Sequence, residues 1–111
     1  MNKEFNCPVE ATISLIGGKY KSVILVHLMG KTLRYSELHK KIPKATDKML
    51  AQQLRELEKD GLIKRTVYPV VPPKTEYNLT EFGESLSPIL NAMCNWGESY
   101  LNIPSQCVEE S

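Results

Sequence analysis

Apolar residues at helical spacing predict two N-terminal helices over residues 7–29. The first begins at Pro8, because proline is tolerated in the first turn of a helix, and it ends at Gly17-Gly18. The second is expected to end at Gly30, which is the residue type that most often follows a helix. The chain therefore starts with a helical segment that turns once.

Two further helices are predicted close together over residues 36–60. Ser36 is expected to cap a short helix that ends near Lys41, and Thr46 is expected to cap a longer one that Gly61 ends. In the longer helix, leucines at i, i+4 and i+7 face inward; they are Leu50, Leu54 and Leu57. A short helix, a tight connection and a second helix predict a helix-turn-helix.

After Gly61 the pattern changes to β-branched and aromatic residues. Leu62–Tyr68 and Lys74–Leu79 are expected to be strands, and the prolines between them make a stiff turn, so residues 62–79 predict a wing hairpin. Thr80 is expected to cap one long C-terminal helix over residues 80–103. The prediction is a single domain over residues 1–111 of the α+β class, mainly helical, with a two- to three-stranded wing.

The charge of the chain is segregated, although its net charge is only +1. From Lys19 to Lys74 there are thirteen basic residues against five acids, whereas from Thr75 to Ser111 there are six acids and no lysine or arginine. A basic middle favours a polyanionic partner, and the C-terminal part is not needed for that contact.

The helix after Thr46 carries the candidate DNA-reading face. Lysine and arginine suit phosphate oxygens or guanine edges, glutamine makes paired bonds to adenine, and methionine contacts a thymine methyl. In and beside the helix-turn-helix, the predicted DNA contacts are Ser36, Lys44, Thr46, Lys48, Met49, Gln52, Gln53 and Arg55. For this helix alone, a solvated polar face without a partner is an equally good interpretation.

The basic hairpin favours duplex DNA as the partner over a solvated face without a partner. Lys64, Arg65 and Lys74 flank the proline-rich tip, where a projecting wing lays cations on the backbone or in the minor groove. An alternative stays open, in which the winged domain associates with an acidic protein. Steep salt dependence and a preference for one duplex sequence distinguish DNA binding from that alternative.

These residues resemble a known family, the HxlR-type winged helix-turn-helix regulators. The resemblance rests on Cys7–Glu10, Leu15–Lys19, Leu54–Glu58, Asp60–Ile63, Val71–Lys74, Glu76–Tyr77, Leu79–Gly83 and Trp96–Gly97. It implies a homodimeric transcriptional regulator that binds double-stranded DNA at a near-palindromic operator. Residues 44–48 depart from the commoner family pattern at the start of the reading helix, so the operator sequence does not transfer from relatives.

A wide apolar stripe on the C-terminal helix also predicts a second copy, because it offers more apolar surface than a 12.6 kDa domain covers comfortably. The predicted dimer-interface residues are Leu86, Ile89, Leu90, Met93, Trp96 and Tyr100. Two reading helices about 34 Å apart would engage successive major grooves on one side of the duplex.

Cys7 is the candidate redox sensor. The resemblance implies a position at which some family members carry a thiol that responds to quinones, aldehydes or oxidants. The positive potential and free N–H groups of a helix start favour the nucleophilic thiolate. Inert packing of Cys7 is the alternative. A small-molecule or electrophile effector is therefore left open, and Cys107 is a hypothetical disulfide partner for Cys7 of a second subunit.

Other classes of protein lack their signals in this sequence. There is no glycine-rich phosphate loop, nucleophile elbow or HExxH motif, so no enzyme is expected. No histidine has a cysteine or carboxylate at ligand spacing, so no metal or cofactor is expected. No apolar run approaches the roughly 20 residues that span a bilayer, so we expect no membrane association and a cytoplasmic location, with repression as the default outcome of binding.

Overall fold

The computed structural model describes residues 5–104. Its helices are α1 (Pro8–Ile16), α2 (Lys21–Leu28), α3 (Tyr35–Lys41), α4 (Asp47–Lys59), α5 (Glu81–Glu84) and α6 (Ser87–Leu101). Its strands are β1 (Leu33–Arg34), β2 (Ile63–Tyr68) and β3 (Lys74–Leu79). Along the chain, two helices precede β1, two more precede the β2-β3 hairpin, and two follow it.

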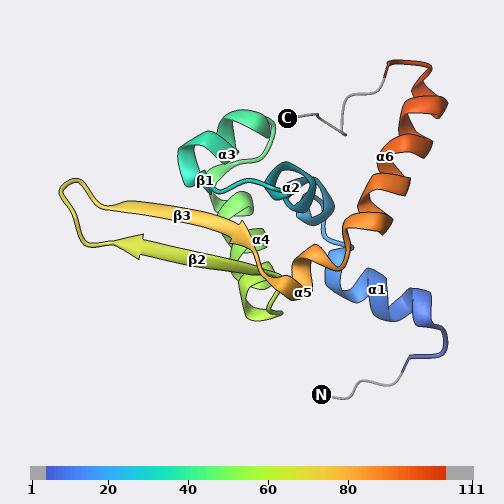
Figure 1. Cartoon of the computed structure of the whole chain (residues 1–111), viewed down its shortest axis with the longest axis horizontal. Coiled ribbons are helices and arrows are strands. Elements are labelled where there is room, and N and C mark those ends of the chain that lie inside the picture. Colours follow the sequence, from blue (N-terminus) through green and yellow to red (C-terminus); the bar gives the residue numbers. More distant parts are fainter. Residues whose placement is uncertain (1–4, 105–111) are drawn as a thin grey trace.

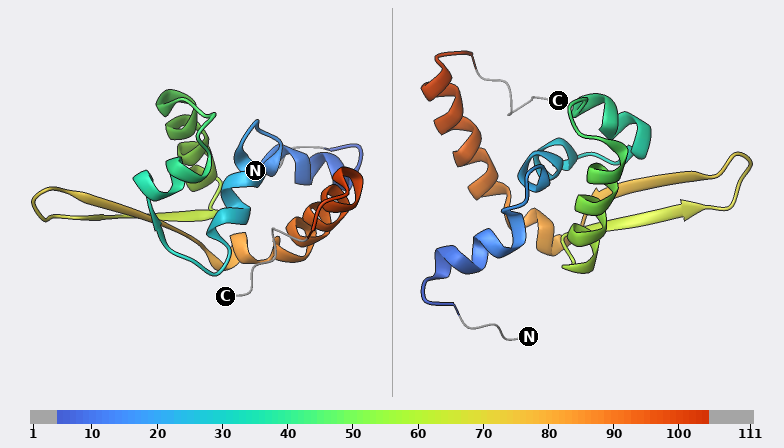
Figure 2. Two further views of the ribbon diagram at one scale, coloured as in Figure 1. Left: turned by 90° about the horizontal axis from the view of Figure 1, so that it is seen from above. Right: turned by 180° about the vertical axis from the view of Figure 1, so that it is seen from behind.

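The strands form an antiparallel sheet in the order β1-β3-β2. β2 pairs with β3 from Ile63 opposite Leu79 to Tyr68 opposite Lys74, and the short β1 adds to the other edge of β3. The hairpin projects to one side of the body, and α1 and α6 project to the opposite side (Figures 1 and 2). The predicted α+β winged helix-turn-helix fold is confirmed.

The core lies where α2, α3 and α4 meet the base of the sheet. Leu50, Leu54 and Leu57 of α4 are buried as predicted, and they pack in one cluster with α2 and α3. Burial of a leucine side chain contributes about 1.5–3 kcal/mol. This cluster therefore fixes how α4 is rotated, and with it which residues of α4 reach the surface.

Two predicted helix boundaries are wrong. Ser36 does not cap α3: the helix begins at Tyr35, and Arg34 is its N-terminal cap residue. The Glu37 carboxylate accepts a hydrogen bond from the Arg34 backbone N–H at 2.8 Å. The predicted C-terminal helix is two helices, because Pro88 has no N–H to donate to the Glu84 carbonyl, as a continuous helix requires. Thr80 caps only the short α5.

Candidate nucleic-acid interface

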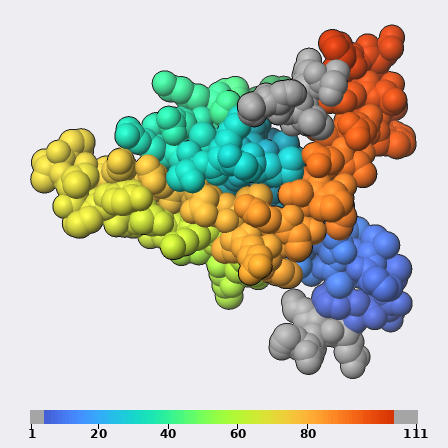
Figure 3. Space-filling view, in the orientation of Figure 1, coloured from blue at the N-terminus to red at the C-terminus, as the bar shows by residue number. Residues whose placement is uncertain are grey.

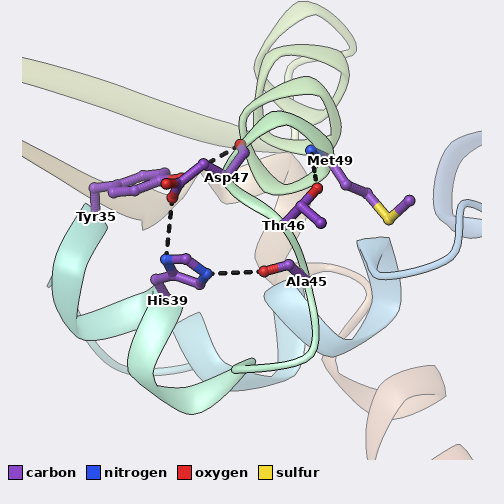
Figure 4. Close-up of polar contacts among 6 residues, drawn as sticks. All are labelled: Tyr35, His39, Ala45, Thr46, Asp47 and Met49. Atoms are coloured by element: carbon purple, nitrogen blue, oxygen red, sulfur yellow. Dashed lines mark hydrogen bonds and ion pairs between the residues drawn. The ribbon is translucent and has the colours of Figure 1, made fainter.

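The first turn of α4 is fixed by its cap. Thr46 has an extended backbone, and its hydroxyl oxygen accepts a hydrogen bond from the Met49 N–H at 3.1 Å (Figure 4). Such a cap is worth about 1 kcal/mol to the helix. The predicted start of α4 is confirmed, and the connection from α3 to α4 is short and ordered by this bond.

Side chains from α3 hold the same turn from the other side. The Tyr35 hydroxyl donates to Asp47 Oδ1 at 2.8 Å, and the His39 ring lies between the Asp47 carboxylate and the Ala45 carbonyl (Figure 4). Burial, and then the hydrogen bond to Asp47, raise the pKa of Tyr35 to about 12. Tyr35 therefore stays a neutral donor at physiological pH, and the two helices of the motif are joined by polar contacts as well as by the core.

The outer face of α4 is polar and carries both basic and acidic residues. Lys48, Gln52 and Arg55 are exposed, Met49 is half-buried beside them, and Thr46 is exposed at the start. A shallow hollow on this face is lined by Gln52, Arg55, Glu56, Glu58 and Lys59. Ser36 on α3 and Lys44 in the turn are also exposed. The structure thus leaves these predicted contacts accessible to a partner.

Gln53 is the exception, and its prediction as a base-reading residue is wrong. Its side chain is only 8% exposed, and its Oε1 accepts a hydrogen bond from the Tyr20 N–H at 2.9 Å. A Cβ at Gly18 would lie 2.6 Å from the same oxygen, so glycine leaves room there for the Gln53 amide in its present position. Gln53 follows Gln52 in sequence, but the rotation of α4 turns it toward the body.

A buried lysine joins α2 to α4. Lys21 is 7% exposed, and its Nζ lies 2.7 Å from Glu56 Oε1. The second carboxylate oxygen, Oε2, accepts a hydrogen bond from Gln52 Nε2 at 3.3 Å. Lys21, followed by Gln52, lowers the pKa of the Glu56 carboxyl. Lys21 and Gln52 therefore stabilise the ionised form of Glu56 beside the polar face of α4.

The basic residues of the wing are not equivalent. Lys64 and Arg65 are both exposed on β2, but successive residues of a strand point to opposite faces, so one duplex surface does not meet both in the same way. Lys74 is half-buried, with its Nζ 3.8 Å from Glu76 Oε2 and 4.8 Å from the centre of the Tyr68 ring. Val71, at the tip, is 99% exposed.

The C-terminal helix carries two apolar stripes. Leu86 and Leu90, predicted as dimer-interface residues, are 9% and 1% exposed and belong to the core of their own chain, so that part of the prediction is wrong. The second stripe is exposed and holds the other predicted residues, Ile89, Met93, Trp96 and Tyr100. The Trp96 and Tyr100 rings stack with centroids 5.5 Å apart.

Helix α1 has an exposed apolar face of its own. Val9 and Ile13 lie on it, and Figure 3 shows α1 and α6 as separate protrusions on the same side of the molecule. Cys7 precedes α1 as its N-terminal cap residue; it is a free, exposed thiol. The hypothetical partner Cys107 lies outside the described residues.

Residues 5–104 contain neither a metal-binding cluster nor a membrane-spanning helix. No group of three histidine, cysteine or acidic side chains is arranged to hold a metal ion there. No helix in the same range is long and apolar enough to cross a membrane.

Sequence patterns missed several residues that shape the interface. Glu56 lies four positions after Gln52, and this i, i+4 spacing alone indicates a side-chain hydrogen bond on a helix. No local pattern indicates that Lys21, more than thirty positions earlier, supplies the counter-charge. The contacts of Tyr35 and His39 with Asp47 likewise appear only once α3 and α4 are packed together.

Comparisons with known proteins extend over most of the chain. A model of HxlR-like helix-turn-helix proteins matches residues 15–105. A Bacillus subtilis (strain 168) protein, named as HTH-type transcriptional regulator YtcD, is 55% identical over 100 residues, which cover 90% of this chain and 79% of that protein.

Two solved structures agree with this chain in shape as well as in sequence. The crystal structure of ytcD has a TM-score of 0.81 and 54% identity, and the match covers 86% of this chain and 98% of that one. The redox regulator HypR in its oxidized form has a TM-score of 0.80 and 50% identity, with coverage of 84% and 96%.

Proposed function

We propose, because this chain belongs to the HxlR-like helix-turn-helix family, that it binds a near-palindromic operator as a homodimer and represses transcription there. The relatives are HTH-type transcriptional regulators, and the chain is a DNA-binding regulator of transcription. What we propose beyond this is that the chain forms a homodimer, that it binds a near-palindromic operator, and that binding represses transcription. From that role we expect a cytoplasmic location and no catalytic activity.

One observation carries the DNA-binding proposal: α4 is capped at its start, and its outer face is polar and exposes Lys48, Gln52 and Arg55. In helix-turn-helix proteins the N-terminal half of the second helix enters the major groove. We therefore assign base reading to Lys48, Met49 and Gln52, and phosphate contacts to the surrounding residues. The phosphate set is Ser36, Lys44, Thr46, Arg55, Lys64, Arg65 and Lys74.

The test is a fluorescence-anisotropy titration with the duplex upstream of the gene and with a scrambled duplex. The unmodified protein should prefer the first duplex and lose affinity steeply with salt. The double variant Lys48→Glu, Gln52→Ala should lose that preference while its circular dichroism spectrum stays unchanged. Equal, weak binding of the unmodified protein to both duplexes would support the alternative, a module for protein association.

The second copy of this chain is the proposed occupant of the exposed faces of α1 and α6. Single folded domains rarely expose large contiguous apolar patches, and here aromatic and aliphatic residues gather on two helices that project away from the wing. A contact through them would leave both α4 faces and both wings open to the duplex. The interface residues we propose are Val9, Ile13, Ile89, Met93, Trp96 and Tyr100.

Cys7 supports a second, regulatory function. We propose that oxidation or alkylation of this exposed thiol at the start of α1 releases DNA, because α1 belongs to the proposed dimer contact. HypR, a redox regulator, shares 50% identity with this chain. Treatment with diamide or a quinone should weaken operator binding in the unmodified protein and not in Cys7→Ser. Equal release of both proteins would exclude Cys7 as the sensor.

A further inference from the structure

Three polar side chains form a continuous line from the core to the outer face of α4. Lys21, on α2, is buried and contacts Glu56 Oε1 at 2.7 Å; Glu56 Oε2 accepts from Gln52 Nε2 at 3.3 Å. Gln52 is exposed and lines the hollow on the outer face of α4. A residue in the position to read bases is therefore connected to a buried charge on another helix.

Lys21 fixes the middle of this line. A buried ammonium group is costly unless it is paired, so the folded protein holds the Glu56 carboxylate against it. A glutamate carboxyl is ionised at neutral pH with its ordinary pKa, and Lys21 lowers that pKa further. An ionised carboxylate has acceptor oxygens only, and one of these two oxygens is engaged by the lysine.

The free oxygen of Glu56 in turn determines how the Gln52 amide is oriented. A glutamine amide has one oxygen and one NH2 group, and on its own it is free to turn either of them toward a neighbour. Beside a carboxylate only the NH2 orientation is favourable, because two acceptor oxygens repel each other. One N–H of Gln52 is thus used by Glu56, while the second N–H and the carbonyl oxygen remain available.

We infer that Lys21 and Glu56 are positioning residues that hold the Gln52 amide in one orientation, and that this sets a preference for adenine at one position of each operator half-site. The remaining N–H and carbonyl oxygen of Gln52 match the N7 acceptor and N6 donor of adenine in the major groove. The inference rests on the proposed function, since it requires that α4 lie in the groove.

The same geometry predicts an effect on specificity that differs from its effect on affinity. Removal of the Glu56 charge leaves the lysines and arginines that contact phosphates in place, and it also removes a negative charge near the duplex. The affinity of the Glu56→Gln variant for DNA, averaged over sequences, should therefore equal or exceed that of the unmodified protein. Its side chain offers both a donor and an acceptor to Gln52, so either amide orientation is allowed and the adenine preference weakens.

The experiment measures relative affinities for operator duplexes in which each half-site position carries each of the four base pairs. The unmodified protein should show one position where adenine is preferred on the order of tenfold, the discrimination typical of a paired contact. Gln52→Ala should abolish that preference. Glu56→Gln should reduce it to about threefold or less at that position only, with the other positions unchanged.

Glu58→Gln is the matched control, because it removes the same charge from an exposed residue of the same helix. It should keep the full adenine preference. Lys21→Met, checked for an unchanged circular dichroism spectrum, should weaken the preference in the same direction, because the Glu56 carboxylate is then able to turn away from Gln52. Glu56→Gln leaves the buried Lys21 ammonium without its counter-charge, so its circular dichroism spectrum is checked in the same way. Both variants should weaken the preference while their spectra stay unchanged.

The outcomes separate this inference from the function on which it rests. If Gln52→Ala leaves every base preference unchanged, the placement of α4 in the groove is wrong. If Gln52→Ala abolishes the adenine preference and Glu56→Gln matches Glu58→Gln, DNA reading by α4 stands and the positioning role is overturned. A preference for guanine at the position that responds to Gln52→Ala would overturn it as well.

Discussion

Helices α4 and α6 are both amphipathic, yet they show opposite chemistry to their surroundings. α4 buries its leucines and exposes lysine, arginine and glutamine, whereas α6 buries Leu90 and exposes Trp96 and Tyr100. The first exposed face suits a polyanion in water, and the second suits another apolar surface. The exposed side of each helix, rather than its buried side, therefore indicates what the helix binds.

The largest expected effect is on the free energy of unfolding, and it distinguishes the buried apolar residues of α6 from the exposed ones. Leu90→Ala should lower the free energy of unfolding by about 2–5 kcal/mol, because it opens a cavity in the core. Ile89→Ala, one position away on the exposed stripe, should cost the isolated chain much less. Urea unfolding at low protein concentration measures both variants, and equal losses would contradict the division into core and interface stripes.

The next effect concerns the exposed stripe itself. Trp96→Ala and Tyr100→Ala should each raise the dimer dissociation constant by about thirtyfold, since aromatic residues dominate interface energies. Analytical ultracentrifugation measures the change, with Asn95→Ala as a control on an exposed polar residue of the same helix. If the unmodified protein is already a monomer, α6 does not form a dimer contact and the proposal is wrong.

A smaller effect distinguishes the wing from α4. Arg65→Ala should weaken binding to specific and scrambled duplexes by the same factor, because a phosphate contact carries no sequence information. It should also reduce the slope of log affinity against log salt by about 0.9. If instead Arg65→Ala changes base preference, the wing reads sequence and the contrast with α4 is weaker than proposed.

The smallest effect lies on α2, the helix that contacts both α4 and α6. Burial, and then the charges of Lys41 and Lys31, lower the pKa of His27 below its ordinary value of 6.5. The unfolded chain therefore binds the proton more tightly, so stability is full above about pH 6.5 and falls as the pH drops below it. His27→Gln should flatten this part of the curve in urea unfolding at pH 7.5 and 5.5. An unchanged pH dependence would contradict it.

The sequence predicts those features that rest on short-range rules. Thr46 caps α4 and Gly61 follows it, with φ of 80°, because cap residues act within one turn of a helix. The hairpin is predictable from two β-rich runs around a proline-rich turn. The outer face of α4 follows from the spacing of its leucines, and that spacing also places Lys48 and Gln52 outside.

The remaining features depend on contacts between distant residues. Gln53 was predicted to face outward from its neighbours in sequence, but its partner, the Tyr20 N–H, belongs to α2. Leu86 was grouped with Trp96 because one helix was predicted where Pro88 makes two, and Leu90 because the spacing along α6 does not show which of its apolar residues meet the core. Lys21 has no local signal of burial, since only the packed position of Glu56 makes that burial tolerable.

The close approach of Gly18 to the Gln53 amide has a consequence for how the protein tolerates change. A methyl group at position 18 would meet atoms of Gln53 at 2.6 and 3.0 Å, so an alanine there requires the Gln53 amide to shift away from its bond with Tyr20. We expect an alanine at 18 to require a shorter residue at 53, and that shorter residue to release the backbone of Tyr20. Substitutions at two sites thirty-five residues apart in sequence are therefore expected to have coupled effects on stability.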